Sequence, residues 1–258
     1  LFYDFRDLTP PGAEGDEMVR KMVRRLVDVD LLPQAAEFMK WQVDNRLEGV
    51  AKAQVATDLA SIYLMDRKPE QALQAIWGSR TTLLPTALNN ERRVLEARAL
   101  MELNRYDAAL EILGKDVSTG ALDVRAEVYW RQKDWVNAAA IYEKRLGDRF
   151  KTAGTPLSGE EETRLIRAGV AYTLAGDVKS LARLSDRFGG FIDGARAPEA
   201  LRIALAGLDG DGITPSDFAR VTAQADTFAS WVAGAKKRFR DGRTAVVGAA
   251  AAVKSAGA

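Results

Sequence analysis

The sequence predicts an all-α protein, either one large domain or an elongated array, and three observations support this prediction. Apolar residues recur at spacings of three and four along almost the whole chain, which is the period of a helix that buries one face. Alternating runs rich in Val, Ile and Thr, which would predict strands, are scarce. The helical segments also resemble one another, and such self-similarity is typical of stacked repeats.

Composition limits the function before any motif is considered. The 258 residues include 37 Lys and Arg against 36 Asp and Glu, with no His and no Cys. A chain without imidazole or thiol groups has no His general base, no Cys nucleophile, no zinc finger and no internal disulfide. We therefore expect a protein that is not an enzyme and that holds no cofactor.

The first 15 residues are expected to form an extended lead-in. The segment Thr9–Gly12 contains two consecutive prolines and cannot be helical. The chain begins with Leu1, and no basic segment followed by an apolar one precedes the fold, so we expect a processed or excised piece of a longer chain. No apolar run approaches the roughly 20 residues that a membrane-spanning helix needs, and no transmembrane segment is expected.

Residues 16–190 repeat one pattern: a small residue, a Tyr or Leu three positions later, a turn, and then a small residue in the next helix. The first small residues of the four clearest copies are Ala60, Ala97, Ala126 and Gly169. Because small side chains let two helices approach closely, we expect these four residues at helix crossings. The equivalent second-helix positions are Ala36, Ala72, Ala109, Ala138 and Leu181, with successive steps of 29 to 43 residues.

This pattern resembles the tetratricopeptide repeat (TPR), a helix–turn–helix unit of about 34 residues. The resemblance implies an α-solenoid of antiparallel helix pairs that binds its partners in a concave groove. The chain departs from the family at Leu181, where the family has Ala, and at Glu96 and Arg125, where it prefers Leu. A loop at residues 151–158 lengthens one step, so the repeats are expected to be degenerate. The alternative is an unrelated helical bundle with coincidental spacing.

One helix start is marked by its capping residues. Ser158 and Glu161 have the spacing of a capping box, so a helix is expected to begin there. Glu160, Glu161 and Glu162 are consecutive, and consecutive residues fan around a helix instead of converging. We therefore interpret them as stabilising the helix dipole and not as a catalytic acid pair.

Residues 191–243 are expected to form C-terminal capping helices, at about 198–207, 215–228 and 229–240, that cover the last apolar face of the array. Pro215 stands at a first helical position, which suits its fixed backbone angle. Residues 244–258 are expected to be a flexible, Ala-rich tail. The apolar residues that we expect this cap to bury are Phe218, Val221, Phe228 and Trp231.

The resemblance also assigns a binding surface, on the first helix of each pair. A protein or peptide partner is expected to bind there, because the positions mix polar residues with apolar anchors. Mapped onto this chain, the groove residues are Gln54, Thr57, Ser61, Leu64, Arg98, Met101, Glu127, Trp130 and Arg131.

A second candidate surface is the basic cluster near the C-terminus. It contains Lys236, Lys237, Arg238 and Arg240, and it is expected either to contact an anionic surface or an acidic partner, or to be a solvated helix end. The net charge of +1 argues against nucleic acid as a partner. No metal site is expected: the Asp209–Gly212 segment hints at a calcium loop, but residues at two of the ligand positions do not fit one.

The sequence therefore favours a non-enzymatic protein–protein interaction scaffold. The Ala/Arg/Asp-rich composition and the segment Gln42–Leu47 resemble bacterial TPR proteins of the cell envelope and flagellar apparatus, which implies a periplasmic or membrane-tethered part of a larger assembly. The alternative is a cytoplasmic TPR adaptor or chaperone-like subunit. An α-superhelical enzyme with a carboxylate site is the least favoured reading, and the oligomeric state is left open.

Overall fold

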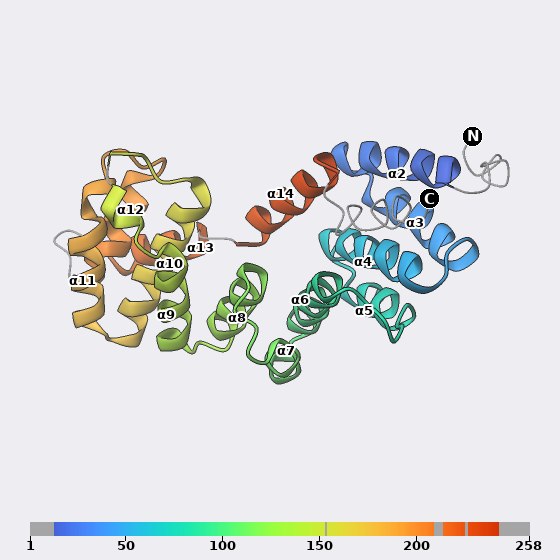
Figure 1. Cartoon of the computed structure of the whole chain (residues 1–258). Helices are drawn as coiled ribbons and strands as arrows, with labels where there is room; N and C mark the ends of the chain where they lie inside the picture. Colours follow the sequence, from blue (N-terminus) through green and yellow to red (C-terminus); the bar gives the residue numbers. More distant parts are fainter. Residues whose placement is uncertain (1–12, 153, 209–213, 225–226, 243–258) are drawn as a thin grey trace, which may run out of the picture. The chain divides into compact units, whose positions relative to one another are not determined.

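The computed structural model describes residues 13–152, 154–208, 214–224 and 227–242, and every regular element in these ranges is a helix (Figure 1). In chain order the elements are α2 (Ala13–Asp28), α3 (Leu32–Asn45), α4 (Gly49–Met65), α5 (Pro69–Trp77), α6 (Thr86–Glu102), α7 (Tyr106–Leu113), α8 (Thr119–Arg131), α9 (Trp135–Leu146), η2 (Arg149–Thr152), α10 (Gly159–Ala175), α11 (Val178–Phe188), η3 (Gly189–Phe191), α12 (Pro198–Ala206), α13 (Pro215–Gln224) and α14 (Thr227–Arg240). The all-α prediction is confirmed for the described residues.

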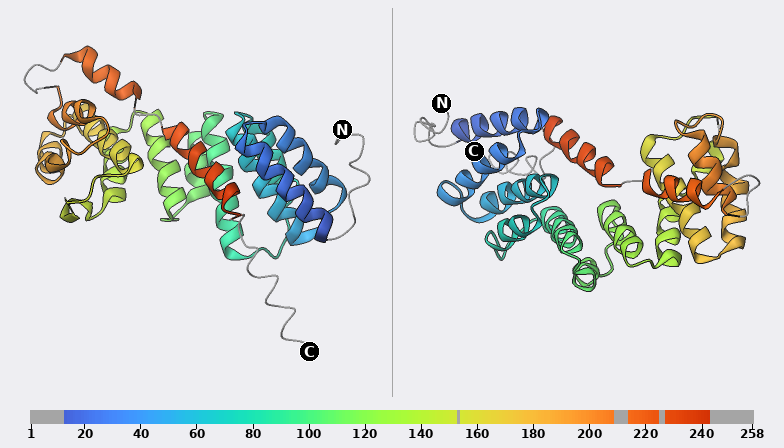
Figure 2. Two further views of the ribbon diagram at one scale, coloured as in Figure 1. Left: turned by 90° about the horizontal axis from the view of Figure 1, so that it is seen from above. Right: turned by 180° about the vertical axis from the view of Figure 1, so that it is seen from behind.

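Helices that follow one another in the sequence pack against one another. The pairs α2–α3, α4–α5, α8–α9 and α10–α11 are in contact, and so are the links α3–α4, α5–α6 and α9–α10 (Figure 2). By its contacts the described part of the chain divides into a first unit, residues 13–108 and 232–242, and a second unit that lies within residues 109–231. The predicted domain boundaries differ from this division and stay a prediction.

The turns inside five successive helix pairs share one backbone geometry. In each turn one residue is left-handed, with φ between 58° and 68°: Asp30, Arg67, Asn104, Lys133 and Gly176. The N–H of the following residue donates to the carbonyl five positions back: Leu31 to Leu26, Lys68 to Tyr63, Arg105 to Leu100, Asp134 to Tyr129 and Asp177 to Tyr172, all at 2.8–3.0 Å. These bonds define a Schellman motif, which satisfies carbonyls that the helix end leaves unpaired.

The small residues predicted at crossings are all buried. Ala60 and Ala97 are 0% exposed, Ala126 is 1% exposed, and Gly169 is buried as well. At Gly169 the reason is a backbone approach, since a Cβ there would lie 2.3 Å from the carbonyl oxygen of Ala204 in α12. Only a residue without a side chain allows α10 and α12 this contact.

A buried arginine ties the helices of the first unit together. Arg92 of α6 is 4% exposed, and its guanidinium donates to the carbonyl oxygens of Ala53, at 2.9 Å, and Ile76, at 2.5 Å. It also donates to the hydroxyls of Thr57, at 3.2 Å, and Ser79, at 3.1 Å. Because these partners lie on α4, on α5 and just after α5, one side chain links α6 to both helices.

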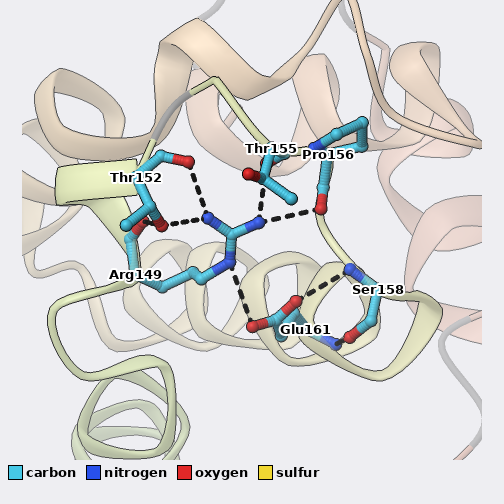
Figure 3. Close-up of polar contacts among 6 residues, drawn as sticks. All are labelled: Arg149, Thr152, Thr155, Pro156, Ser158 and Glu161. Carbon is cyan, nitrogen blue, oxygen red and sulfur yellow. Dashed lines mark hydrogen bonds and ion pairs between the residues drawn. The ribbon is translucent and has the colours of Figure 1, made fainter.

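The loop between α9 and α10 is held by Arg149 (Figure 3). Its Nε lies 3.1 Å from Oε1 of Glu161, and its Nη2 donates to the carbonyl oxygens of Thr155, at 2.6 Å, and Pro156, at 2.8 Å. Its Nη1 donates to Thr152. Glu161 closes the capping box with Ser158, so the predicted helix start is confirmed. All the Arg149 donors are used by this loop and by Glu161 in the first turn of α10, so Arg149 holds the loop against that helix.

The C-terminal helices differ from the expectation in their bounds. They span 198–206, 215–224 and 227–240, and α13 begins at Pro215 as predicted. Phe218 and Val221 are 5% and 2% exposed, and they pack into the core that Leu165, Leu184 and Phe188 share with α12.

Other predictions for the chain ends are tested only in part. The expected burial of Phe228 and Trp231 is wrong: both are partly exposed, and their rings lie 5.9 Å apart. The first helix begins at Ala13, inside the expected lead-in of residues 1–15. The Asp209–Gly212 turn and the tail at residues 244–258 lie outside the described residues.

Candidate functional site

The groove residues predicted in the first unit lie mostly inside the helix packing. Thr57 and Met101 are 0% exposed, and Leu64 is 1% exposed. Ser61 and Arg98 are also buried, while Gln54 is partly exposed. For the residues of α4 the cause is composition: its residues from Ala53 to Met65 are largely apolar, and a helix that is apolar all round is buried all round. Whether any of these residues meets a partner stays a prediction.

In the second unit the structure brings three predicted groove residues together. Glu127 and Trp130 of α8 contact Arg167 of α10: the Arg167 Nη1 lies 2.6 Å from Glu127 Oε2, and its guanidinium lies 4.5 Å from the Trp130 ring centre. Arg131 pairs with the other Glu127 oxygen at 3.4 Å. The Tyr142 hydroxyl accepts from Arg167 Nη1 at 2.8 Å. We call these five residues the Glu127–Arg167 cluster.

The charges of this cluster are strongly coupled. Burial by itself raises the pKa of Glu127, but the positive charge of Arg167, the hydrogen bond that the Thr227 hydroxyl donates, and Arg131 together lower that pKa below its usual value. Burial raises the pKa of Tyr142 to about 12, so its hydroxyl stays neutral and accepts from Arg167. With its carboxylate and guanidinium paired to each other, the cluster can hold α8, α9 and α10 in register. It offers no activated nucleophile.

A cleft that the sequence analysis did not anticipate opens between α10, α11 and α12. Its volume is about 440 Å³. Its side includes exposed apolar residues, with Val178 65% and Leu208 46% exposed. The residues that line this cleft, here called the α10–α12 cleft, are Tyr172, Thr173, Gly176, Val178, Leu181, Ala182, Ser185, Asp186, Leu205, Ala206, Gly207 and Leu208. The only trace of it in the sequence is that an apolar residue, Val178, directly follows the helix N-cap Asp177.

A charged group stands beside the cleft. The hydroxyl of Tyr172 donates to Glu143 of α9, and Glu143 also pairs with Arg183 at 2.8 Å and Arg187 at 3.4 Å, both on α11. Burial raises the pKa of Glu143, but the hydrogen bonds from Arg183 and Tyr172 and the charges of the two arginines outweigh it and hold that pKa below its usual value. Arg183 and Arg187 keep 44% of their side-chain surface exposed, and Tyr172, which lines the cleft, joins this charged group to it.

The basic cluster of α14 is partly used within the first unit. Lys236 forms an ion pair with Asp30, and Arg240 Nε lies 3.5 Å from Asp28 Oδ1. Lys237 and Arg238 are exposed. Contact of this cluster with an anionic surface stays a prediction.

A comparison with protein families, curated proteins and solved structures finds no match to this chain. The fold by itself therefore gives the class, an all-helical protein of sequentially packed helix pairs. No described helix is long and apolar enough to cross a membrane. Among the described residues, no group of three or more acidic side chains is placed to hold a metal ion.

Proposed function

We propose that this chain is a non-enzymatic protein-interaction scaffold built as a TPR-like α-solenoid of degenerate repeats. The five equivalent Schellman turns support the repeat reading, because their left-handed residues recur at steps of 29 to 43 residues, like the sequence pattern. Within each unit, packing between successive pairs supports a repeat stack, through α3–α4 and α5–α6 in the first unit and α9–α10 in the second, since each pair of a solenoid packs on its neighbours.

The observation that carries the binding role is the α10–α12 cleft. The exposed apolar side chains of Val178 and Leu208 line it together with Tyr172, and the Tyr172 hydroxyl donates to Glu143, which pairs with Arg183. An apolar centre with a polar rim is the usual anatomy of a protein interface. We propose that a partner protein or peptide inserts an apolar side chain into this cleft, while the predicted groove around Trp130 and Arg131 is a second contact surface.

Site-specific photo-crosslinking in the native cell tests this proposal. A photoreactive residue is placed at Val178 in the cleft, at Arg131 in the predicted groove, or at Val136 of α9. Val136 is the matched control, because it is also an exposed apolar valine of the second unit, 60% exposed. We expect a discrete adduct with one partner at Val178 and none at Val136.

The three positions separate the outcomes. An adduct at Arg131 alone would move the binding surface to the predicted groove. Equal labelling at Val178 and Val136, or none at any position, would contradict a scaffold that acts through these surfaces. The envelope-associated compartment also stays a proposal, with the cytoplasm as alternative, and fractionation of cells that carry the tagged full-length gene product tests it.

A further inference from the structure

A second hollow lies in the first unit, between α3, α4 and α5, and it is unrelated to the cleft described above. Its volume is about 160 Å³. Each helix contributes one face: Lys40, Val43 and Asp44 from α3, Lys52, Leu59 and Tyr63 from α4, and Gln71, Gln74 and Ala75 from α5. The spacings of three, four and seven residues place each set on one side of its helix.

The floor of this pocket is apolar and its walls carry hydrogen-bond donors. Val43 and Leu59 are buried, at 6% and 2% exposed. Lys52 and Tyr63 also line the pocket, and neither the Lys52 ammonium nor the Tyr63 hydroxyl has a hydrogen bond or ion pair to another described residue. The amides of Gln71 and Gln74 also have no hydrogen bond within the described part of the chain.

The charges of the pocket leave one cation without a counter-ion among the described residues. Lys40 forms an ion pair with Asp44, so these two cancel. Lys52 remains as a net positive charge that faces the hollow. Burial raises the pKa of Tyr63, although Lys40 and Lys68 oppose the effect, so the hydroxyl stays protonated and can donate.

We propose that this pocket binds a small aliphatic monocarboxylate. One uncompensated ammonium matches one negative charge, and the Tyr63 hydroxyl with the two amides can donate to carboxylate oxygens, which form the stronger, charge-assisted class of hydrogen bond. The Val43 and Leu59 floor takes a short alkyl chain. The volume equals that of about five water molecules, at roughly 30 Å³ each, which suits an acid of about four carbons.

Two alternatives fit this pocket less well. A phosphate ester carries more charge than Lys52 alone balances, and the pocket contains no arginine to bind it in a bidentate way. A cationic ligand would face the ammonium groups of both Lys40 and Lys52, with only the already paired Asp44 to attract it. The apolar floor and the donor-rich walls together select the monocarboxylate.

Calorimetric titration of the full chain with sodium butyrate tests the proposal, with butyramide as the neutral analogue of the same shape. We expect saturable butyrate binding that the amide does not reproduce. Lys52→Met should weaken this binding more than tenfold, because it removes the cation, and Tyr63→Phe about tenfold, because it removes one donor to a charged ligand. Lys144→Met is the control, because Lys144 is an exposed lysine of the second unit, and it should leave binding unchanged.

Three results of the titration would overturn the proposal. Butyrate and butyramide that bind equally, or butyrate that does not saturate the parent chain, would overturn the proposal. Equal loss in Lys52→Met and Lys144→Met would show non-specific ion pairing and would also overturn it. Circular dichroism of each variant confirms that the fold is kept, and because Lys52 is partly exposed we expect no loss of helix content.

Discussion

Arg167 and Glu127 are 40 residues apart in the sequence, yet their charged groups meet at 2.6 Å in the interior of the second unit. The side chain of Arg167 is 5% exposed and that of Glu127 is 12% exposed. The same guanidinium donates to Tyr142 and lies over the ring of Trp130. The pair therefore connects the first helix of one pair with the first helix of the next, and it fixes the ring of Trp130.

The first prediction is that Arg167→Met destabilises the protein by about 3–5 kcal/mol, because it leaves the carboxylate of Glu127 buried without its main partner. The double variant Arg167→Met with Glu127→Leu should be less destabilised than Arg167→Met alone, since no unpaired charge then remains. Urea unfolding followed by circular dichroism measures both. If the double variant has a lower free energy of unfolding than either single variant, the prediction is wrong, and the attraction within the pair exceeds the cost of burying its two charges.

The second prediction concerns the close approach of α10 to α12. Gly169→Ala should destabilise by about 1–3 kcal/mol or more, because the added Cβ would meet the backbone of Ala204 and the helices must separate. Gly234→Ala is the control. Its Cβ would meet nothing within 4 Å, so this helix-interior change should stabilise by up to about 1 kcal/mol. Thermal unfolding of the two variants should shift the midpoint in opposite directions, and a parallel shift would contradict the crossing geometry.

The third prediction follows from Asp58 of α4, which is 8% exposed. Burial, with the negative charge of Glu91, raises its pKa well above the usual value, although Arg238, Arg20 and Arg24 oppose this. The ionised carboxylate therefore opposes folding above its folded-state pKa, and the penalty vanishes below its unfolded-state pKa of about 3.9. Asp58→Asn should be more stable than the parent at pH 7 and equally stable near pH 3.

Denaturant unfolding of Asp58→Asn and the parent at several pH values measures this difference. The advantage of the variant should shrink steadily as the pH is lowered. If the variant is more stable by the same amount at every pH, the gain comes from packing or hydrogen bonding of the Asn amide and not from the lost charge of Asp58.

The burial of a side chain was harder to predict than the helix that carries it. The pattern correctly placed Ala60 and Ala126 inside the packing, because a small residue at a helix crossing leaves a local signature. The resemblance assigns Thr57 and Met101 to a groove; both are buried in the first unit, and whether either meets a partner stays a prediction. For each groove residue, the resemblance predicts only which helix carries it and where along that helix it lies. The depth of a side chain also depends on what the neighbouring helices place above it.

The amino-acid sequence by itself determined the local features of the fold, which depend on residues close together in the chain. Apolar spacing gave the helices, Ser158 with Glu161 gave a capped start, and Pro215 gave another, because hydrogen bonds and backbone angles within a few residues control these features. Only the tertiary structure decided that Arg92 links three helices, that Arg167 meets Glu127, and that Val178 borders an open cleft. Those relationships join residues up to 40 positions apart, and they depend on the angle and distance at which helices pack, which no local pattern encodes.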